Sequence, residues 1–282
     1  MPSIDELKEQ QRRQWSGNAG GWDAMHERLE RETRPVTEWL CDEAGLKPGM
    51  RVLDLACGSG LPALEIAVRV APGGSVIATD LVPEMVEATL RRAGETGVAN
   101  VEARVMDAED IGFPDEAFDA VTCRFGIMFC PQPDVALREI RRVLKPEGRL
   151  TMSVWADPKY SPGQTVVGEA LRRFGRPQPE PDFEAPGIYQ LAPDGKLERF
   201  LKDVGFGEVR VERLPVVWDY ESQDALWQRQ AARSGPLRSL QEELSPEDWQ
   251  RLQSIFGEVI EPFTDQGRIH IPVTPLCGVA QK

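Results

Sequence analysis

An apolar segment that breaks into closely spaced glycines lies near residue 50 of the chain. Residues 52–60 read Val-Leu-Asp-Leu-Ala-Cys-Gly-Ser-Gly. Residues 52–55 are all apolar except Asp54. Such a run predicts a short strand buried on both faces, as in a parallel sheet. Over residues 61–70 the apolar positions recur at helical spacing, and Pro62 suits a helix start. The pattern predicts a strand, a glycine turn and a helix, with a ligand site at the carboxyl end of the strand.

Residues 1–45 are expected to be helical and lid-like. The stretch Gly17-Asn-Ala-Gly-Gly21 is expected to interrupt the helix, which would leave a flexible joint between two helical pieces. Trp15 and Trp22 lie close together in this segment. They either close over a bound ligand or attach the segment to the sheet, and the sequence does not separate these two interpretations.

Beyond residue 156 the pattern is less regular. A region rich in Pro and Gly runs from 157 to 193, and we expect it to border a pocket. The stretch 222–262 is mostly helical and is expected to cap the carboxyl edge of the sheet. The elements expected in order are a short helix at 195–204, a strand at 209–217, the helical stretch at 222–262 with a break near Gly235 and Pro236, and a closing strand from 269–271 and 275–280.

Two ligand classes use a glycine turn of this kind. Residues 58–63 match the G-x-G-x-x-A dinucleotide fingerprint, and Asp80 stands about 20 residues on, where a ribose-binding carboxylate is expected. Against a dinucleotide, Asp54 lies inside the strand, no glycine follows the strand directly, and the chain lacks a second glycine turn of similar quality. An NAD-dependent oxidoreductase and a non-catalytic cofactor-binding protein are the alternatives kept.

The residues around the turn resemble the first motif of the class I S-adenosylmethionine-dependent methyltransferases, hydrophobic-Asp-x-x-x-Gly-x-Gly. The resemblance covers about residues 45–156 and is closest to small-molecule enzymes of the ubiquinone/menaquinone-biosynthesis type. It implies S-adenosyl-L-methionine as cofactor and methyl transfer to a small acceptor. The further segments that carry it are 76–80, 81–85, 101–109, 113–125 and 139–150.

The resemblance implies roles for the acidic residues within the strands and just after them. Asp80 would bind the two ribose hydroxyls, or cap the helix that begins near Pro83. Asp107 would hold the adenine amino group, or be a turn residue alone. Asp54 would accept N–H bonds from the glycine turn, or contact the ligand. The complete set expected to bind the cofactor is Trp22, Asp54, Ala56, Gly58, Gly60, Asp80, Leu81, Met85, Asp107, Ala108, Cys123 and Arg124.

A sulfonium methyl is already activated, so alignment of the acceptor supplies most of the acceleration. A hydroxyl or protonated amine acceptor also needs a general base, and an imidazole suits neutral pH. Of the two histidines, His26 lies in the expected lid and is the candidate base, with simple exposure as the alternative. Phe125 and Met128 line the acceptor pocket or belong to the core. The complete set expected to bind the acceptor is Phe125, Met128, Trp155, Tyr160 and Tyr189.

Together the elements predict an α/β fold with a Rossmann-like, seven-stranded, mostly parallel sheet and an antiparallel closing strand. At 282 residues the chain exceeds a typical domain of about 150. The expected parts are an N-terminal helical lid at 1–45, a cofactor-binding core at 46–156, and a segment 157–282 that completes the sheet and carries substrate-cap insertions.

Composition excludes several partners. With 33 basic and 46 acidic residues, the formal charge of -13 disfavours nucleic acid and anionic membranes. Five cysteines without a C-x-x-C pair predict free thiols, and with two histidines they predict no metal site. The polar first ten residues and the lack of an apolar run near 18 residues indicate a cytoplasmic protein. We expect a monomer or homodimer whose partner is a small, aromatic or apolar methyl acceptor.

Overall fold

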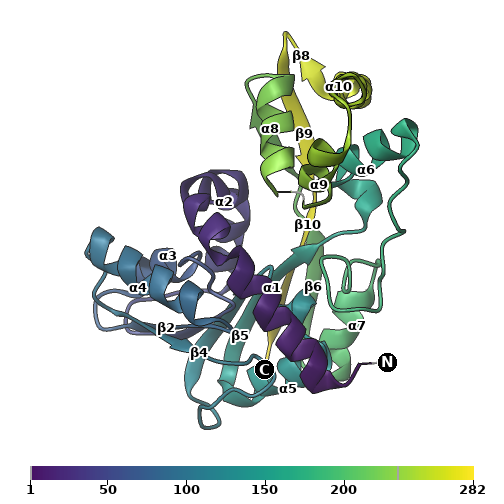
Figure 1. The fold of residues 1–282 in the computed structure, drawn as a ribbon. Coiled ribbons are helices and arrows are strands. Elements are labelled where there is room, and N and C mark those ends of the chain that lie inside the picture. The colour runs from purple at the N-terminus through teal and green to yellow at the C-terminus, as the bar shows by residue number, and fades with distance from the viewer. Residues whose placement is uncertain (1, 234) are drawn as a thin grey trace. The chain divides into compact units, whose positions relative to one another are not determined.

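A computed structural model describes residues 2–233 and 235–282 (Figure 1). The chain divides into two compact units. The first comprises Met1–Ala156, Asp182–Leu214 and Pro275–Lys282, and the second comprises Asp157–Pro181 and Pro215–Thr274. The region expected as one C-terminal segment therefore contributes to both units. The expected domain boundaries themselves stay a prediction.

The first unit contains a seven-stranded sheet in the order β3-β2-β1-β4-β5-β10-β6. Strand β10 is antiparallel to both of its neighbours, whereas the pairings among β3, β2, β1, β4 and β5 are parallel. This confirms the predicted fold class. The strands are β1 (Arg51–Leu55), β2 (Ser75–Asp80), β3 (Val101–Val105), β4 (Phe118–Arg124), β5 (Leu144–Trp155), β6 (Gly207–Arg213) and β10 (Pro275–Gln281).

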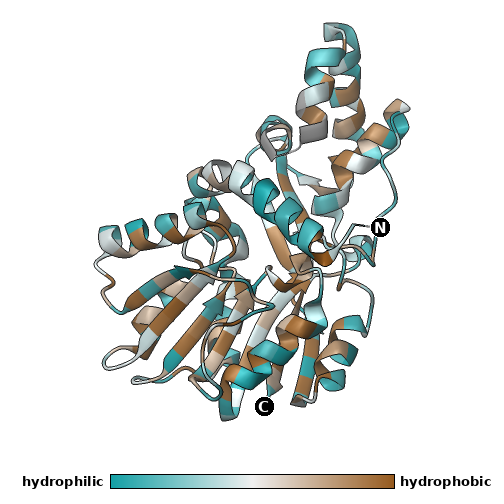
Figure 2. Ribbon diagram, turned by 60° about the horizontal axis from the view of Figure 1, so that its bottom comes forward, coloured by the Kyte–Doolittle hydropathy of each residue, from teal (hydrophilic) through white to brown (hydrophobic). Residues whose placement is uncertain are grey.

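Helices cover this sheet because each buries one apolar stripe against strands that are apolar on both faces. In Figure 2 the strands of the sheet are largely brown, whereas the helices around them alternate between brown and teal. Pro83 opens its helix at the first turn, and Gly97 ends it with a left-handed backbone. The helices of the first unit are α1 (Ile4–Ala24), α2 (His26–Glu43), α3 (Ala63–Val70), α4 (Pro83–Thr96), α5 (Pro133–Val143), α7 (Lys196–Asp203) and the 3₁₀ turn η1 (Ile127–Phe129).

The expected interruption at Gly17–Gly21 is wrong. Helix α1 continues through these residues, and the joint to α2 lies at Met25. Glycine inside a helix costs roughly 0.5–1 kcal/mol relative to alanine, and burial of large side chains on one face offsets that cost. The side chains that pack together are Trp15, Ala19 and Trp22 of α1 with Val82 and Met85 of the α4 start.

The second unit has a three-stranded antiparallel sheet that the sequence did not predict, in the order β7-β9-β8. The strand expected at 209–217 is wrong as a single element, because its two halves lie in different sheets. Likewise 269–271 belong to the small sheet, and only 275–280 complete the large one. The elements are β7 (Val216–Tyr220), β8 (Thr264–Asp265), β9 (Arg268–Val273), α6 (Pro162–Phe174), α8 (Gln223–Arg233), α9 (Gly235–Glu243), α10 (Pro246–Ile260) and the 3₁₀ turns η2 (Pro158–Tyr160) and η3 (Glu261–Phe263).

An aromatic cluster forms the core of the second unit. The ring of Trp227 lies 5.2 Å from that of Trp249 and 5.0 Å from that of Phe256, both edge-on. Such contacts add to the apolar area already buried. The helix break expected near Gly235 and Pro236 adjoins residue 234, which lies outside the described residues.

Candidate active site

The turn after β1 has the backbone shape expected of a ligand cradle. Ala56, Gly58 and Gly60 have φ angles of 54°, 54° and 106°, and the Gly60 N–H donates to the Cys57 carbonyl over 2.9 Å. A Cβ atom placed on Gly58 would meet no other atom within 4 Å. The main chain of Gly58 therefore faces open space, where a ligand can approach it closely.

Asp80 joins the end of β2 to this turn. Its Oδ2 accepts a hydrogen bond from the Gly58 N–H over 2.9 Å, and its Oδ1 accepts one from the Val82 N–H over 3.3 Å. Burial raises the pKa of the Asp80 carboxyl, and the N–H groups of Gly58 and Val82 oppose that rise. Each carboxylate oxygen has a second lone pair, so Asp80 can still accept from two hydroxyls.

Asp54 lies wholly inside the sheet. Its Oδ1 accepts a hydrogen bond from the Thr122 hydroxyl of β4 over 2.6 Å, and its Oδ2 is buried with no hydrogen-bond partner among the described residues. Burial raises the pKa of this carboxyl to about 7, opposed by the Thr122 hydrogen bond and the charge of Arg124. The sequence did not identify Thr122, because β1 and β4 become neighbours only in the folded sheet.

Asp107 is both a turn residue and an ion-pair partner. Its Oδ1 accepts from the Glu109 N–H over 2.9 Å, and its Oδ2 lies 2.8 Å from the Lys8 ammonium of α1. Lys8 also lies 2.8 Å from Glu109 Oε2. Burial lowers the pKa of Lys8, but the two carboxylates outweigh it and raise the value. Sequence reasoning missed Lys8, although the acidic pair at 107 and 109 was a signal for a nearby cation.

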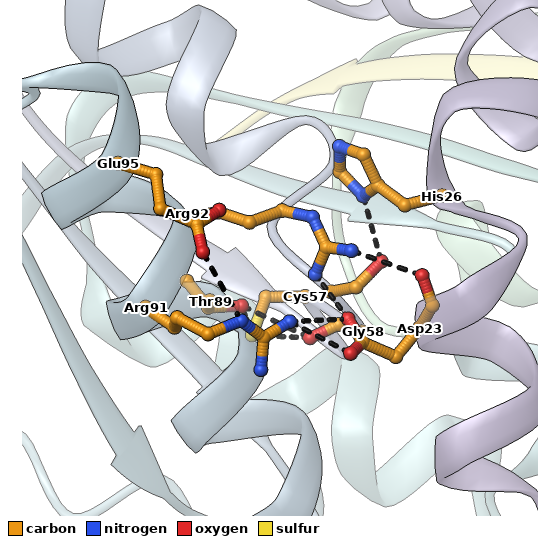
Figure 3. Close-up of polar contacts among 9 residues, drawn as sticks. Asp23, His26, Cys57, Gly58, Thr89, Arg91, Arg92 and Glu95 are labelled. Atoms are coloured by element: carbon orange, nitrogen blue, oxygen red, sulfur yellow. Dashed lines mark hydrogen bonds and ion pairs between the residues drawn. The ribbon is translucent and has the colours of Figure 1, made fainter.

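His26 lies at the start of α2 and faces the glycine turn (Figure 3). Its Nδ1 is 2.8 Å from the Ser59 Oγ. Burial, and after it the charges of Arg92 and Arg124, lower the pKa of His26 to about 4. The imidazole is therefore neutral at pH 7 and a weak base.

The joint between α1 and α2 is clamped to α4 by a charge cluster beside His26 (Figure 3). Both carboxylate oxygens of Asp23 accept from Arg91 over 2.7 Å, and Asp23 also pairs with Arg92. The guanidinium of Arg92 donates to the Asp23 carbonyl as well, over 2.9 Å. Asp23 thus neutralises two arginines that lie next to the turn.

Arg124 is the last residue of β4, and its side chain extends toward α2. Its Nη1 donates to the hydroxyls of Thr33 and Thr37, the latter over 3.3 Å. Its Nε is buried without a hydrogen-bond partner in the part of the chain that the structure describes. Burial lowers the pKa of Arg124 to about 10, opposed chiefly by the charge of Asp54. The two threonine partners were not foreseen from the sequence.

Phe125 and Trp155 form a flat aromatic wall. Their rings stack with centroids 4.3 Å apart and planes inclined by 17°. Phe125 directly follows β4 with a φ of 60°, and its N–H donates to the Ser153 carbonyl over 2.9 Å. Both side chains are half-buried, so the wall keeps accessible surface.

The other expected site residues have varied surroundings. Met128 and Cys123 are each 1% exposed and lie in the core of the first unit. The Met128 carbonyl accepts from the Gly187 N–H over 2.9 Å, which anchors the segment that carries half-buried Tyr189. Tyr160 belongs to the second unit, whereas the other candidates belong to the first. Trp22 and Met85 pack together, whereas Ala56, Leu81 and Ala108 are half-buried.

Metal-ligand clusters and membrane-spanning helices are both absent from residues 2–233 and 235–282. No group of three or more His, Cys, Asp or Glu side chains there could hold a metal ion. No helix in the same ranges is long and apolar enough to cross a membrane. The five cysteines are free thiols.

A family model described as a methyltransferase domain matches residues 53–152. Among curated proteins, nocamycin O-methyltransferase of Saccharothrix syringae is 31% identical over 63% of this chain and 66% of that protein. The ubiquinone/menaquinone biosynthesis C-methyltransferase UbiE of Pseudomonas putida is 40% identical over 41% of this chain and 45% of its own. Both matches span less than two thirds of the relative's length. Demethylmenaquinone methyltransferase of Renibacterium salmoninarum is 31% identical over 65% of this chain and 77% of its own length.

Solved structures share the fold. YcgJ of Bacillus subtilis matches 87% of this chain and 97% of its own with a TM-score of 0.56 and 21% identity. The cyclase SpnF matches 87% of this chain and 80% of its own with a TM-score of 0.55 and 21% identity. At such identities the likeness concerns the fold alone, and SpnF shows that this fold also occurs in a protein described as a cyclase.

Proposed function

Because this chain belongs to the class I S-adenosylmethionine-dependent methyltransferases, we propose that it transfers a methyl group from S-adenosylmethionine to a small metabolite. The observation that carries this proposal is the turn at Gly58, which faces open space and is tied to the Asp80 carboxylate. The acceptor atom is an oxygen, nitrogen or carbon, since O- and C-methyltransferases both occur among the relatives.

The residues at the carboxyl edge of the sheet fit this cofactor. Asp80 has free lone pairs for the ribose hydroxyls, and Asp107 with Ala108 suits the adenine amino group. The open main chain of Gly58 admits a ligand, and the buried, unpartnered Oδ2 of Asp54 leaves an acceptor below the turn. The bound cofactor supplies a methyl group already activated on a sulfonium. The chain's own residues then bind it, orient it and exclude water.

The stacked pair of Phe125 and Trp155 supports an aromatic or apolar acceptor. An exposed aromatic face attracts another flat apolar ring by offset stacking and by burial of area. The two rings keep accessible surface just after β4 and at the end of β5, where ligands of open α/β sheets bind.

His26 stays in the proposed site, but its geometry favours a positioning role over that of a general base. Its Nδ1 is engaged with Ser59 of the glycine turn, and its pKa of about 4 leaves little basicity at neutral pH. The hydrogen bond instead fixes the start of α2 against the turn. The proposal is therefore a site that works by alignment.

Calorimetric titration with S-adenosylhomocysteine and, separately, with NAD tests the cofactor. We expect binding of the first with a dissociation constant on the order of micromolar, about -8 kcal/mol, and none of the second. Binding of NAD alone would overturn the proposal and favour an oxidoreductase. The named relatives described above are methyltransferases.

A second experiment tests catalysis, because the fold alone does not establish it. Transfer of labelled methyl from S-adenosylmethionine is measured against a panel of phenols, aromatic amines and quinols. Cofactor binding without transfer to any of them would favour a non-catalytic cofactor-binding protein. A cytoplasmic location and a monomeric or homodimeric state belong to the same proposal, and cell fractionation and light scattering test them.

A further inference from the structure

Helix α1 turns one face toward the segments that follow the sheet strands, and Gln11 lies on that face. Lys8 is three positions before Gln11 and Trp15 is four positions after it, so the three side chains share one side of the helix. The Lys8 ammonium contacts Asp107 in the loop after β3. The ring of Trp15 lies 4.9 Å from that of Phe129, in the turn after β4. Gln11 therefore faces the space between these two segments.

The amide of Gln11 is buried with an unused acceptor. The residue is 8% exposed, and its Oε1 has no hydrogen-bond partner among residues 2–233 and 235–282. A buried carbonyl oxygen that loses water without gaining a donor costs free energy, and an apolar side chain would fill the same position without that cost. The unused acceptor therefore indicates a donor that a ligand supplies.

Adenine offers such a donor, because its amino group carries two N–H bonds. The proposed function gives this group one side chain, that of Asp107. The Oδ1 of Asp107 already accepts from the Glu109 N–H, and its Oδ2 is paired with Lys8. An amide side chain suits adenine, since its oxygen accepts from the amino group while its nitrogen donates to a ring nitrogen. Gln11 is within reach, because residues three positions apart in a helix have Cβ atoms about 5–6 Å apart.

We propose that Gln11 completes the adenine site, with its Oε1 accepting from the adenine amino group. This inference rests on the proposed function, because it takes the adenine of the cofactor to lie beside Asp107. Helix α1 then takes part in choosing the ligand. A purine without an amino group leaves the oxygen of Gln11 buried and unpaired, and a site built around a hydrogen bond discriminates against a ligand that lacks it.

The test compares S-adenosylhomocysteine with its 6-deamino analogue, in which a hydrogen replaces the adenine amino group. In the wild type, calorimetry should show S-adenosylhomocysteine bound roughly 10- to 100-fold more tightly than the analogue. Gln11→Met removes both polar atoms of the amide and keeps the length and helix propensity of the side chain. It should weaken S-adenosylhomocysteine roughly five- to thirtyfold and leave the analogue within about twofold of wild type.

Gln10→Met is the matched control. Gln10 is the neighbouring glutamine of α1, and it is exposed. The control should leave both affinities unchanged. The same variants also separate a ligand-binding role of Gln11 from a structural one. Because Gln11→Met removes an acceptor that is unpaired before the cofactor binds, the denaturant midpoint of the ligand-free protein should stay the same or rise.

Three results would overturn the inference. An affinity for S-adenosylhomocysteine within about twofold of wild type in Gln11→Met would remove Gln11 from the adenine site. Equal losses for both ligands would show that the amino group is not its partner. A lower midpoint or a loss of folded protein in Gln11→Met would assign the residue a structural role. If the wild type binds neither ligand, the proposed function itself has failed.

Discussion

A Cβ atom on Gly126 would lie only 2.3 Å from the Cβ of Ala56. The turns after β4 and β1 therefore meet without room for a methyl group. Gly126 has an ordinary φ of -100°, so an alanine there would suffer from the contact and not from its backbone. Overpacking of this kind costs roughly 1–3 kcal/mol.

Gly126→Ala should lower the free energy of unfolding by that amount and weaken S-adenosylhomocysteine binding, because the displaced Ala56 belongs to the glycine turn. Denaturant titration and calorimetry measure the two effects. Gly94→Ala is the control, since Gly94 lies in α4 with no atom within 4 Å of an added Cβ. It should be neutral or stabilise by about 0.5–1 kcal/mol. Equal behaviour of the two variants would contradict the close approach.

Asp80→Ala should weaken S-adenosylhomocysteine binding by roughly 1–3 kcal/mol, because charged hydrogen bonds to the ribose are lost. The variant also frees the N–H groups of Gly58 and Val82. Asp80→Asn retains one acceptor oxygen and should lie between Asp80→Ala and wild type. Calorimetry measures the affinities, and an unchanged value in Asp80→Ala would remove this residue from the site.

The stability of the protein should fall in acid partly through His26. Its pKa is about 4 in the folded state against 6.5 for the ordinary group. Between pH 4 and pH 6.5 the unfolded chain therefore binds more protons at His26 than the folded protein does. The stability contributed by neutral His26 is present above about pH 6.5 and is lost as the pH falls toward 4. His26→Gln should show a shallower decline over this window. Denaturant midpoints at half-unit steps of pH measure it, and parallel curves for both proteins would contradict the shift.

Lys8→Met should loosen the first turns of α1, because both ion pairs to Asp107 and Glu109 disappear. The expected loss of stability is roughly 1–3 kcal/mol, because Asp107 is partly exposed whereas the Glu109 carboxylate, 2% exposed, is left buried without its cation. Hydrogen exchange of the α1 amides should become faster. Arg13→Met is the matched control, because Arg13 is exposed and lies 3.7 Å from Glu9 of its own helix. An equal change in both variants would show that the pairs do not hold α1.

The sequence predicts the part of the site that depends on local pattern. The unit of β1, glycine turn and α3 is visible because strand, glycines and helix follow one another within 20 residues or so. The pairing of β1 with β2 places Asp80, at the end of β2, beside the glycine turn. There its carboxylate accepts a hydrogen bond from the Gly58 N–H.

Long-range partners were not predictable in the same way. Thr122 binds Asp54 across a strand pair, and Lys8 reaches Asp107 from a helix about 100 residues earlier in the chain. The small sheet was missed because β7 pairs with β9, which follows only after three helices. At Gly17–Gly21 the low helix propensity of glycine predicted a break. The helix is nevertheless continuous, because Trp15 and Trp22 pack on one of its faces and stabilise it.

Strand β10 lies between β5 and β6 but follows every residue of the second unit in the chain. During synthesis, β5 therefore leaves the ribosome long before the strand that will cover its edge. Until Pro275–Gln281 emerge, β5 and β6 lack the partner that joins them, and unpaired strand edges favour aggregation. The first unit can complete its sheet only after the whole second unit has been synthesised.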